Sequence, residues 1–253
     1  MKGNRALWMA VTVVAALWMA AAGYAIFFIA PDERTMHAIQ RIFYIHVGSA
    51  WTAGVAFFVV ALAGVLYLVK RDPRYDWAGI AAAETGLVFT TVVLITGPIW
   101  AKPIWGIWWT WDPRLTSTFV LWLMYIAYLL IRTLVEEQHR RAVLCAVYGI
   151  FAFLDVPLVF MSIRWWRGQH PSPVIAGAQP GSGLDPTMKA VLFFTWGATL
   201  VLYAVLMRQR YLLEALRGET EELRQQAEDF APAPGSEGRG FSPAVSGRSG
   251  AGL

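Results

Sequence analysis

Two histidines and a run of tryptophans are the residues in this sequence whose types best suit ligand binding. His46 lies at the start of a long apolar block, and His170 lies in a polar segment after Trp165-Trp166. Between them, residues 100–114 read WAKPIWGIWWTWDPR and hold five of the thirteen tryptophans. Imidazole is a common metal ligand, and an indole ring offers a flat apolar surface with an N–H group at its edge. These residue types favour a site for a large flat ligand that contains a metal.

Each feature also has a simpler interpretation. Tryptophan collects at the headgroup level of membrane proteins as an aromatic belt, and a lone histidine there is more often an interface residue than a ligand. A belt needs only about one or two tryptophans at each helix end. If the segment is helical, one broad aromatic face with indole N–H groups at its wet edge is predicted for Trp105, Trp108, Trp109 and Trp111. The composition alone does not distinguish an aromatic belt from a ligand-binding platform. The two histidines favour the platform.

Haem matches this set of residues. Its iron takes axial histidines, its macrocycle stacks on aromatic rings, and its propionates pair with arginine. The arginines of the same segments are Arg41, Arg114, Arg164 and Arg167. Zinc could use the two histidines and Asp112, but it would give the tryptophans no role. The residue types therefore favour haem over zinc.

The elements that must position these residues are predicted to be membrane-spanning helices. Of 253 residues, 57% are hydrophobic and 15% are charged, whereas a soluble domain is normally about a quarter charged. The apolar residues fall in six blocks, at about residues 7–29, 46–69, 78–100, 117–131, 142–163 and 188–207. Backbone polar groups cannot stay unpaired in lipid, so these blocks should be helices. The predicted fold class is an all-α integral membrane protein, a six-transmembrane-helix bundle with a short fourth span.

The basic residues predict the orientation of the bundle. With the N-terminus inside, the inner segments hold twelve Lys and Arg and the outer segments hold seven, which favours both termini in the cytoplasm. This orientation brings His46, the Trp-rich segment and His170 to the outer face from three different loops. The net charge of +4 comes from short clusters between apolar blocks, which is a pattern of membrane topology rather than of nucleic-acid binding.

Three parts are expected along the chain. Residues 1–210 form a transmembrane haem-handling domain with a Trp-rich outer loop at 100–116, residues 211–230 form a charged cytoplasmic helix, and residues 231–253 form a disordered tail poor in apolar bulk. One cysteine excludes a disulfide framework, a cysteine-based zinc site and a CxxCH haem-attachment motif. No P-loop occurs, so the chain carries no such nucleotide-hydrolysis motif of its own.

Three residues inside the predicted spans need separate interpretation. Asp155 is an acid at membrane depth and so a functional hypothesis by default, although it could instead hydrogen-bond backbone groups freed by Pro157. Glu84 is interpreted as an interfacial acid that faces residues 70–74. Cys145 is interpreted as a packing residue in an apolar helix.

Several motifs together resemble one known family. Trp105-Gly106-x-x-Trp109-x-Trp111-Asp112 matches the WGxxWxWD signature of the haem-handling superfamily of cytochrome c biogenesis. The short chain, its six spans and the residues that follow the signature resemble the haem exporter protein C family (CcmC) of cytochrome c maturation. The segments around His46 and around His170 are similar to the two histidine regions of that family. The resemblance covers about residues 5–210.

The resemblance implies a function and a set of site residues. It implies a protein of the bacterial inner membrane that binds haem b at the periplasmic face and delivers it to a periplasmic haem chaperone. Its partners would be a small single-span membrane protein and the ATPase and membrane subunits of an ABC-type complex. The implied axial ligands of the haem iron are His46 and His170. The implied platform consists of Trp105, Trp109 and Trp111 with Asp112. Arg41 and Arg114 are implied to steer the haem propionates or the chaperone.

Three rival functions fit the sequence less well. A haem lyase of the same superfamily, which attaches haem to apocytochrome c, is usually larger and has more spans and histidines. An electron carrier of the cytochrome b type needs histidines that face each other deep within the spans. A transporter of a non-haem substrate predicts polar residues near the midplane of several helices, where the sequence offers only Asp155. A transfer protein is therefore favoured over an enzyme.

Overall fold

The described part of the chain is helical. The computed structural model describes residues 2–166, 168–171, 175 and 183–230, and no strand occurs among them. The helices are α1 (Lys2–Tyr24), α2 (Ile42–Lys70), α3 (Pro73–Trp105), α4 (Pro113–Leu134), α5 (Gln138–Phe153), α6 (Asp155–Trp165) and α7 (Pro186–Phe230). A π-helical turn, Ala25–Ile29, ends α1, and a 3-10 turn, Ala38–Arg41, precedes α2. Within these residues, six helical segments are long and apolar enough to cross a membrane, so the predicted six-span fold is confirmed.

The ends of the helices near the predicted site differ from the expected ones. The 3-10 turn and the first residues of α2 place His46 in the second turn of a helix rather than at its start. α3 continues five residues beyond the predicted end to Trp105, where Gly106 stops it in the left-handed region at φ 76°. α4 has 22 residues, because Asp112 caps it and Pro113 occupies its first position, so the fourth span is not short.

The predicted fifth span consists of two helices. α5 and α6 are separated at Leu154, where the regular ladder of backbone hydrogen bonds is broken. Pro157 lacks an N–H group and cannot donate to the carbonyl of Phe153, which accounts for a break at this point. Asp155 therefore begins a new helix inside the membrane-spanning segment.

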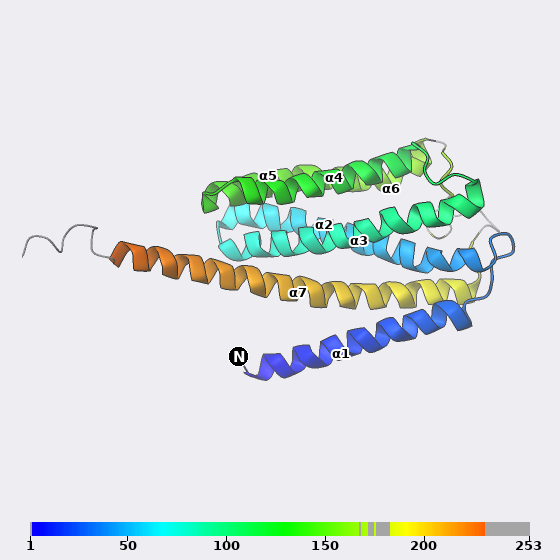
Figure 1. Ribbon diagram of the computed structural model, residues 1–253, viewed down its shortest axis with the longest axis horizontal. Helices are drawn as coiled ribbons and strands as arrows, with labels where there is room; N and C mark the ends of the chain where they lie inside the picture. Colours follow the sequence, from blue (N-terminus) through cyan, green and yellow to red (C-terminus); the bar gives the residue numbers. More distant parts are fainter. Residues whose placement is uncertain (1, 167, 172–174, 176–182, 231–253) are drawn as a thin grey trace, which may run out of the picture. The chain divides into compact units, whose positions relative to one another are not determined.

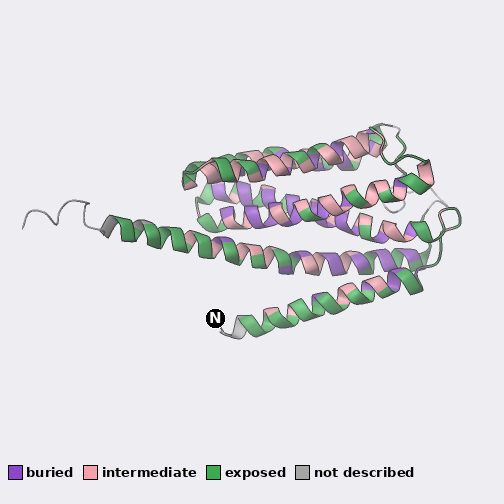
Figure 2. Cartoon of the chain, in the orientation of Figure 1, coloured by how far each residue is buried: buried purple, intermediate pink, exposed green. Residues whose placement is uncertain are grey.

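The centre of residues 1–215 is built from closely packed apolar side chains on α2, α3, α4 and α5. The rings of Phe57 and Tyr125 stack with centroids 3.7 Å apart, and both side chains are fully buried. A β-carbon at Gly86 would lie 2.7 Å from the Phe57 ring, so a glycine there permits the close approach of α3 to α2. Figure 2 shows buried residues along α2 and α3, whereas α1 is exposed along much of its length.

Among the described residues, two ion pairs join the first half of α3 to other helices. Arg132 of α4 binds Asp76 of α3 through two hydrogen bonds of 2.6 and 2.9 Å, and both side chains are buried. Arg210 of α7 binds Glu84 of α3. The expectation that Glu84 faces residues 70–74 is therefore wrong, because its partner comes from a helix distant in the sequence.

α7 is continuous from Pro186 to Phe230, and the contacts divide the chain into two units, residues 1–215 and 216–253. Arg167 and the predicted tail at 231–253 lie outside the described residues. Within the first unit, the connections before α2, between α3 and α4 and after α6 lie at the same end of the helices (Figure 1). These three connections and the helix ends that flank them hold the candidate residues.

Candidate functional site

His46 is fixed by a hydroxyl group on the neighbouring helix. Its Nδ1 lies 2.9 Å from Oγ1 of Thr96 in α3. The Thr96 hydroxyl donates its only proton to the carbonyl of Val92 at 2.7 Å, so it must accept from the imidazole. His46 is therefore protonated at Nδ1, and its Nε2 keeps a free lone pair. This is the arrangement that orients a histidine for metal ligation.

Thr96 is the residue that sequence analysis missed. It lies 50 positions from His46 in the chain, within a run of apolar residues in α3. Only the packing of α2 against α3 brings the two side chains together, so no local motif indicates the pair.

His170 has the same free nitrogen as His46. It follows α6 in the next connection, and its Nδ1 lies 3.0 Å from the carbonyl oxygen of Pro171. A carbonyl can only accept, so Nδ1 carries the proton and Nε2 is left for a ligand. Burial and the nearby cation of Arg114 lower the pKa of His170 to about 4. The imidazole is therefore neutral at neutral pH, as a metal ligand must be.

The structure brings the two histidines into one site. His170 and Arg114 both lie close enough to His46 to act on it electrostatically. The segment that leads to His170 also packs on the connection between α3 and α4, because a β-carbon at Gly168 would lie 3.1 Å from Cβ of Asp112. The loop of His170 is thus held against the Trp-rich segment.

Asp112 has a structural role in this segment. Its Oδ1 accepts hydrogen bonds from the backbone N–H groups of Arg114 and Leu115 at 2.9 and 3.0 Å, and its Oδ2 accepts from Thr110 at 3.1 Å. It is the N-cap of α4, where a carboxylate also interacts well with the helix dipole. The buried Asp112 therefore sets where α4 begins and where the preceding tryptophans lie.

The tryptophans do not form one helical face. Trp105 is the last residue of α3 and packs edge-on against Trp100, with ring centroids 5.1 Å apart. After Gly106 the backbone leaves the helix, and Trp109 packs instead on Trp111 at 5.7 Å and on Phe119 at 6.2 Å. The condition for one helical aromatic face is therefore not met, since the left-handed Gly106 divides the segment into two aromatic groups.

The second aromatic group presents both a surface and an unpaired donor. Trp111 is 73% exposed, and Trp108 is also exposed. Nε1 of Trp109 is buried without a hydrogen-bond partner among the described residues, so this N–H is not at a wet edge. An orphaned donor beside an exposed ring suits a ligand with polar groups at the rim of an apolar plane.

The two arginines of the predicted site are already engaged with the protein. Arg41 forms an ion pair of 3.0 Å with Asp32. Nη1 of Arg114 donates to the carbonyl of Val159 in α6 at 3.0 Å, and its guanidinium lies 5.6 Å from the Phe160 ring centre. Arg114 therefore ties the start of α4 to α6, the helix that leads to His170.

Comparison with known proteins shows the family to which this chain belongs. The sequence matches the family described as Heme exporter protein C over residues 1–226. It is 32% identical over 228 residues to a heme exporter protein C of Bradyrhizobium diazoefficiens, covering 87% of this chain and 86% of the relative. The chain belongs to the haem exporter protein C family. It is thus a multi-pass protein of the bacterial inner membrane that handles haem in cytochrome c maturation.

Other relatives extend the same similarity. Heme exporter protein C of Paracoccus denitrificans is 32% identical over 194 residues, covering 75% of this chain and 79% of the relative. A putative cytochrome c biosynthesis ccmC-like mitochondrial protein of Marchantia polymorpha is 29% identical over 183 residues, covering 72% and 76%. The names of these relatives suggest a transport or transfer component rather than a catalytic enzyme.

Proposed function

We propose that this chain holds haem b between Nε2 of His46 and Nε2 of His170 and delivers it to a periplasmic haem chaperone. The observation that carries the proposal is that both imidazoles use Nδ1 within the protein and keep Nε2 free. Two such nitrogens suit the two axial positions of an iron whose other four positions belong to a macrocycle.

The surroundings of the histidines suit the rest of the haem. The exposed rings of Trp108 and Trp111 offer apolar surface to the macrocycle, and the unpaired N–H of Trp109 can donate to a polar substituent. Arg41 and Arg114 supply positive charge near the propionates, while their protein contacts keep the guanidinium groups in place. Trp105 and Asp112 support the segment from its two ends.

The two ligands differ in how firmly they are held, which suits transfer. His46 lies inside a helix and bonds to a second helix, whereas His170 lies on a connection and, among the described residues, bonds to the adjacent Pro171. The weaker constraint makes His170 the ligand that the chaperone displaces first. Haem then stays on His46 until the chaperone has engaged the iron or the haem edge.

The proposed orientation places this exchange outside the cytoplasm. The distribution of basic residues favours both termini in the cytoplasm, which puts the histidine connections on the periplasmic face. We propose that a small single-span protein and the ATPase and membrane subunits of an ABC-type complex act with the chain. These subunits would provide the nucleotide hydrolysis for which the chain has no P-loop motif.

A transfer assay tests the proposal. The full chain, loaded with haem in lipid nanodiscs, is mixed with the purified apo-chaperone, and the two are separated before their visible spectra are recorded. Haem should move to the chaperone from the wild-type chain. The His46→Ala and His170→Ala variants should retain little haem after loading, and should therefore transfer little. Wild-type chain that keeps all its haem in the presence of the chaperone and the ABC complex would contradict delivery.

A further inference from the structure

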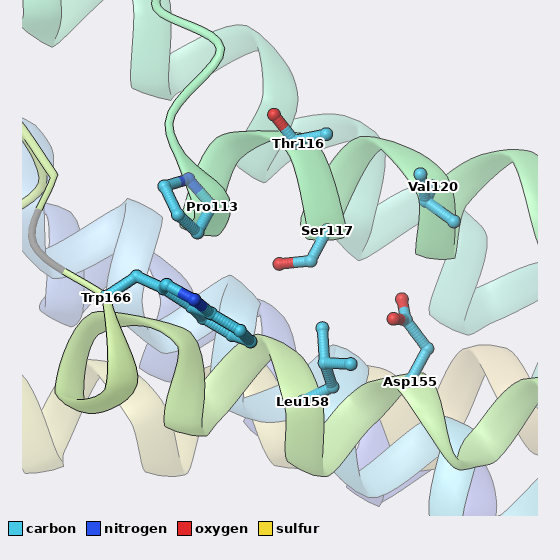
Figure 3. A pocket seen from close by; sticks show the side chains of 7 residues that line it. All are labelled: Pro113, Thr116, Ser117, Val120, Asp155, Leu158 and Trp166. Carbon is cyan, nitrogen blue, oxygen red and sulfur yellow. The ribbon is translucent and has the colours of Figure 1, made fainter.

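A groove between α4 and α6 lies beside the haem site but is not part of it. It has a volume of about 310 Å³ and is lined by Pro113, Thr116, Ser117, Val120, Asp155, Leu158 and Trp166. Figure 3 shows Trp166 lying flat at one end below Pro113, and Asp155 at the other end with its carboxyl group turned toward α4. The groove therefore runs along the two helices from the candidate site into the membrane-spanning region.

The upper end of the groove is continuous with the site. Pro113 follows the capping residue Asp112 directly, and Trp166 precedes the Gly168 segment that packs on Asp112. A ligand lying against Trp166 would therefore be next to the segment that carries His170.

The lower end of the groove holds a polar atom that lacks a partner. Oδ2 of Asp155 is buried without a hydrogen bond among the described residues. The expectation that Asp155 bonds to backbone groups freed by Pro157 is therefore not met. The hydroxyl of Ser117 donates to the carbonyl of Arg114 at 3.2 Å and keeps its acceptor capacity. An orphaned carboxyl oxygen that lines a cavity at membrane depth calls for a ligand.

The depth of Asp155 limits what that ligand can be. Ten residues of helix separate Asp155 from Trp165, which corresponds to about 15 Å, or half of a hydrocarbon core about 30 Å thick. A lone ion is costly there, so the groove suits a neutral group that both donates and accepts, such as a protonated carboxylic acid. The rest of the lining, Val120, Leu158 and Trp166, suits an apolar body.

We propose that this groove is a second haem subsite, open to the lipid, in which a protonated propionate bonds to Asp155 and Ser117 while the macrocycle lies along Leu158 and Trp166. Haem is an apolar plane that carries carboxylic acids, so it has both kinds of group that the groove accommodates. The inference rests on the proposed function, because it takes haem to be the ligand of the adjacent site. It makes the groove the lateral passage between the bilayer and the two histidines.

Photocrosslinking in the full chain tests the subsite without relying on iron ligation. A p-benzoylphenylalanine replaces Val120, which lines the groove, or Leu123, which is similarly exposed on α4 but does not line it. Each protein is placed in lipid nanodiscs with haem and irradiated, and adducts are identified by mass. A haem adduct is expected at position 120 and not at 123, and it should persist in a His46→Ala, His170→Ala background.

The proposed hydrogen bonds of the propionate are tested by changing the protein groups and, separately, the haem carboxyl groups. Asp155→Leu and Ser117→Ala should each lower the adduct yield at position 120 about three- to ten-fold, the usual worth of one hydrogen bond. Thr133→Val, on the same helix away from the groove, should leave the yield unchanged. Haem dimethyl ester, which lacks the acid protons, should give the lower yield with wild type and no further loss with Asp155→Leu.

The outcomes separate this inference from the proposed function. Haem ligated by the two histidines with no adduct at position 120, or a phospholipid adduct there that persists in excess haem, would overturn the subsite and leave the proposed function standing. An adduct at position 120 without histidine ligation would support the subsite and contradict the proposed function. Variants that retain the wild-type histidine-ligated spectrum are folded, so their adduct yields bear directly on the groove.

Discussion

At the scale of single residues, the state of each imidazole depends on one neighbouring oxygen atom. The Thr96 hydroxyl accepts from His46 because its own proton is committed to Val92. His170 obtains the same tautomer from the carbonyl of Pro171. The two ligands are thus prepared in different ways, one through a second helix and one within its own loop.

Thr96→Val should therefore weaken haem retention without removing a ligand. The valine has a similar shape but cannot accept the Nδ1 proton, so His46 loses its fixed tautomer and orientation. Loss of such a supporting hydrogen bond typically lowers metal affinity about 10- to 100-fold. Haem titration of the purified chain measures the change, and Thr96→Ser should restore most of the affinity. Equal affinities for Thr96→Val and wild type would contradict the role given to this hydroxyl.

At the scale of the elements, the start of α4 positions the aromatic segment. Asp112 caps the helix, Pro113 begins it, and Arg114 bonds to the carbonyl of Val159 in α6. Three consecutive residues thus fix the cap, the first turn and the distance between the two helices that flank the groove.

Replacing the cap should separate its structural role from its charge. Asp112→Ala removes the acceptor for two backbone N–H groups and should lower the free energy of unfolding by about 1 kcal/mol. Asp112→Asn keeps a good capping group and should stay within a few tenths of a kcal/mol of wild type, apart from its weaker interaction with the helix dipole. Denaturation in mixed detergent micelles measures both variants. A loss for Asn as large as that for Ala would show that the carboxylate charge, and not the cap, is what matters.

The elements also show how much the sequence could predict. Hydropathy identified all six spans, because a stretch that must pair its backbone in lipid leaves a long apolar run. It misplaced the end of α3, since Lys102 and Pro103 lower the hydropathy of a segment that remains helical to Trp105. It also missed the break at Leu154, because the segment Gln138–Trp165 stays apolar enough on average to count as one span despite Asp155 and Pro157.

At the scale of the whole molecule, the first 215 residues are held by a buried ion pair as well as by apolar packing. Arg132 and Asp76 are each 8% exposed and are joined by two hydrogen bonds. Removing one partner leaves an uncompensated charge, which typically costs about 3–5 kcal/mol, whereas an apolar pair of similar volume is often neutral.

Asp76→Leu should therefore destabilise the chain strongly, and Asp76→Leu with Arg132→Met should recover most of the loss. Unfolding of the single and double variants in detergent, followed by circular dichroism, provides the comparison. Haem binding by the double variant should match that of wild type, because the pair lies at the end of the helices opposite the histidines. A double variant as unstable as the single one would indicate that the attraction between Asp76 and Arg132 stabilises the fold, rather than the absence of an unpaired buried charge.

The arrangement of the site was only partly visible in the sequence. The tryptophan signature and two histidines predicted the ligand class, because five tryptophans cluster within residues 100–111 and imidazole is a common metal ligand. The pairing of His46 with Thr96, the contact of Gly168 with Asp112 and the anchoring of Arg114 on α6 depend on helix packing. Such contacts leave no spacing pattern, so they could not be predicted from one sequence.

The visible spectrum of the purified chain tests the central claim most directly. Oxidised and reduced spectra are recorded for wild type, His46→Ala and His170→Ala. The control is His37→Asn, at an exposed histidine that is not one of the two proposed ligands. The account predicts a Soret band for wild type and the control that shifts or disappears in both alanine variants. A wild-type chain that stays colourless when haem and its partners are supplied, or alanine variants with unchanged spectra, would contradict ligation by His46 and His170.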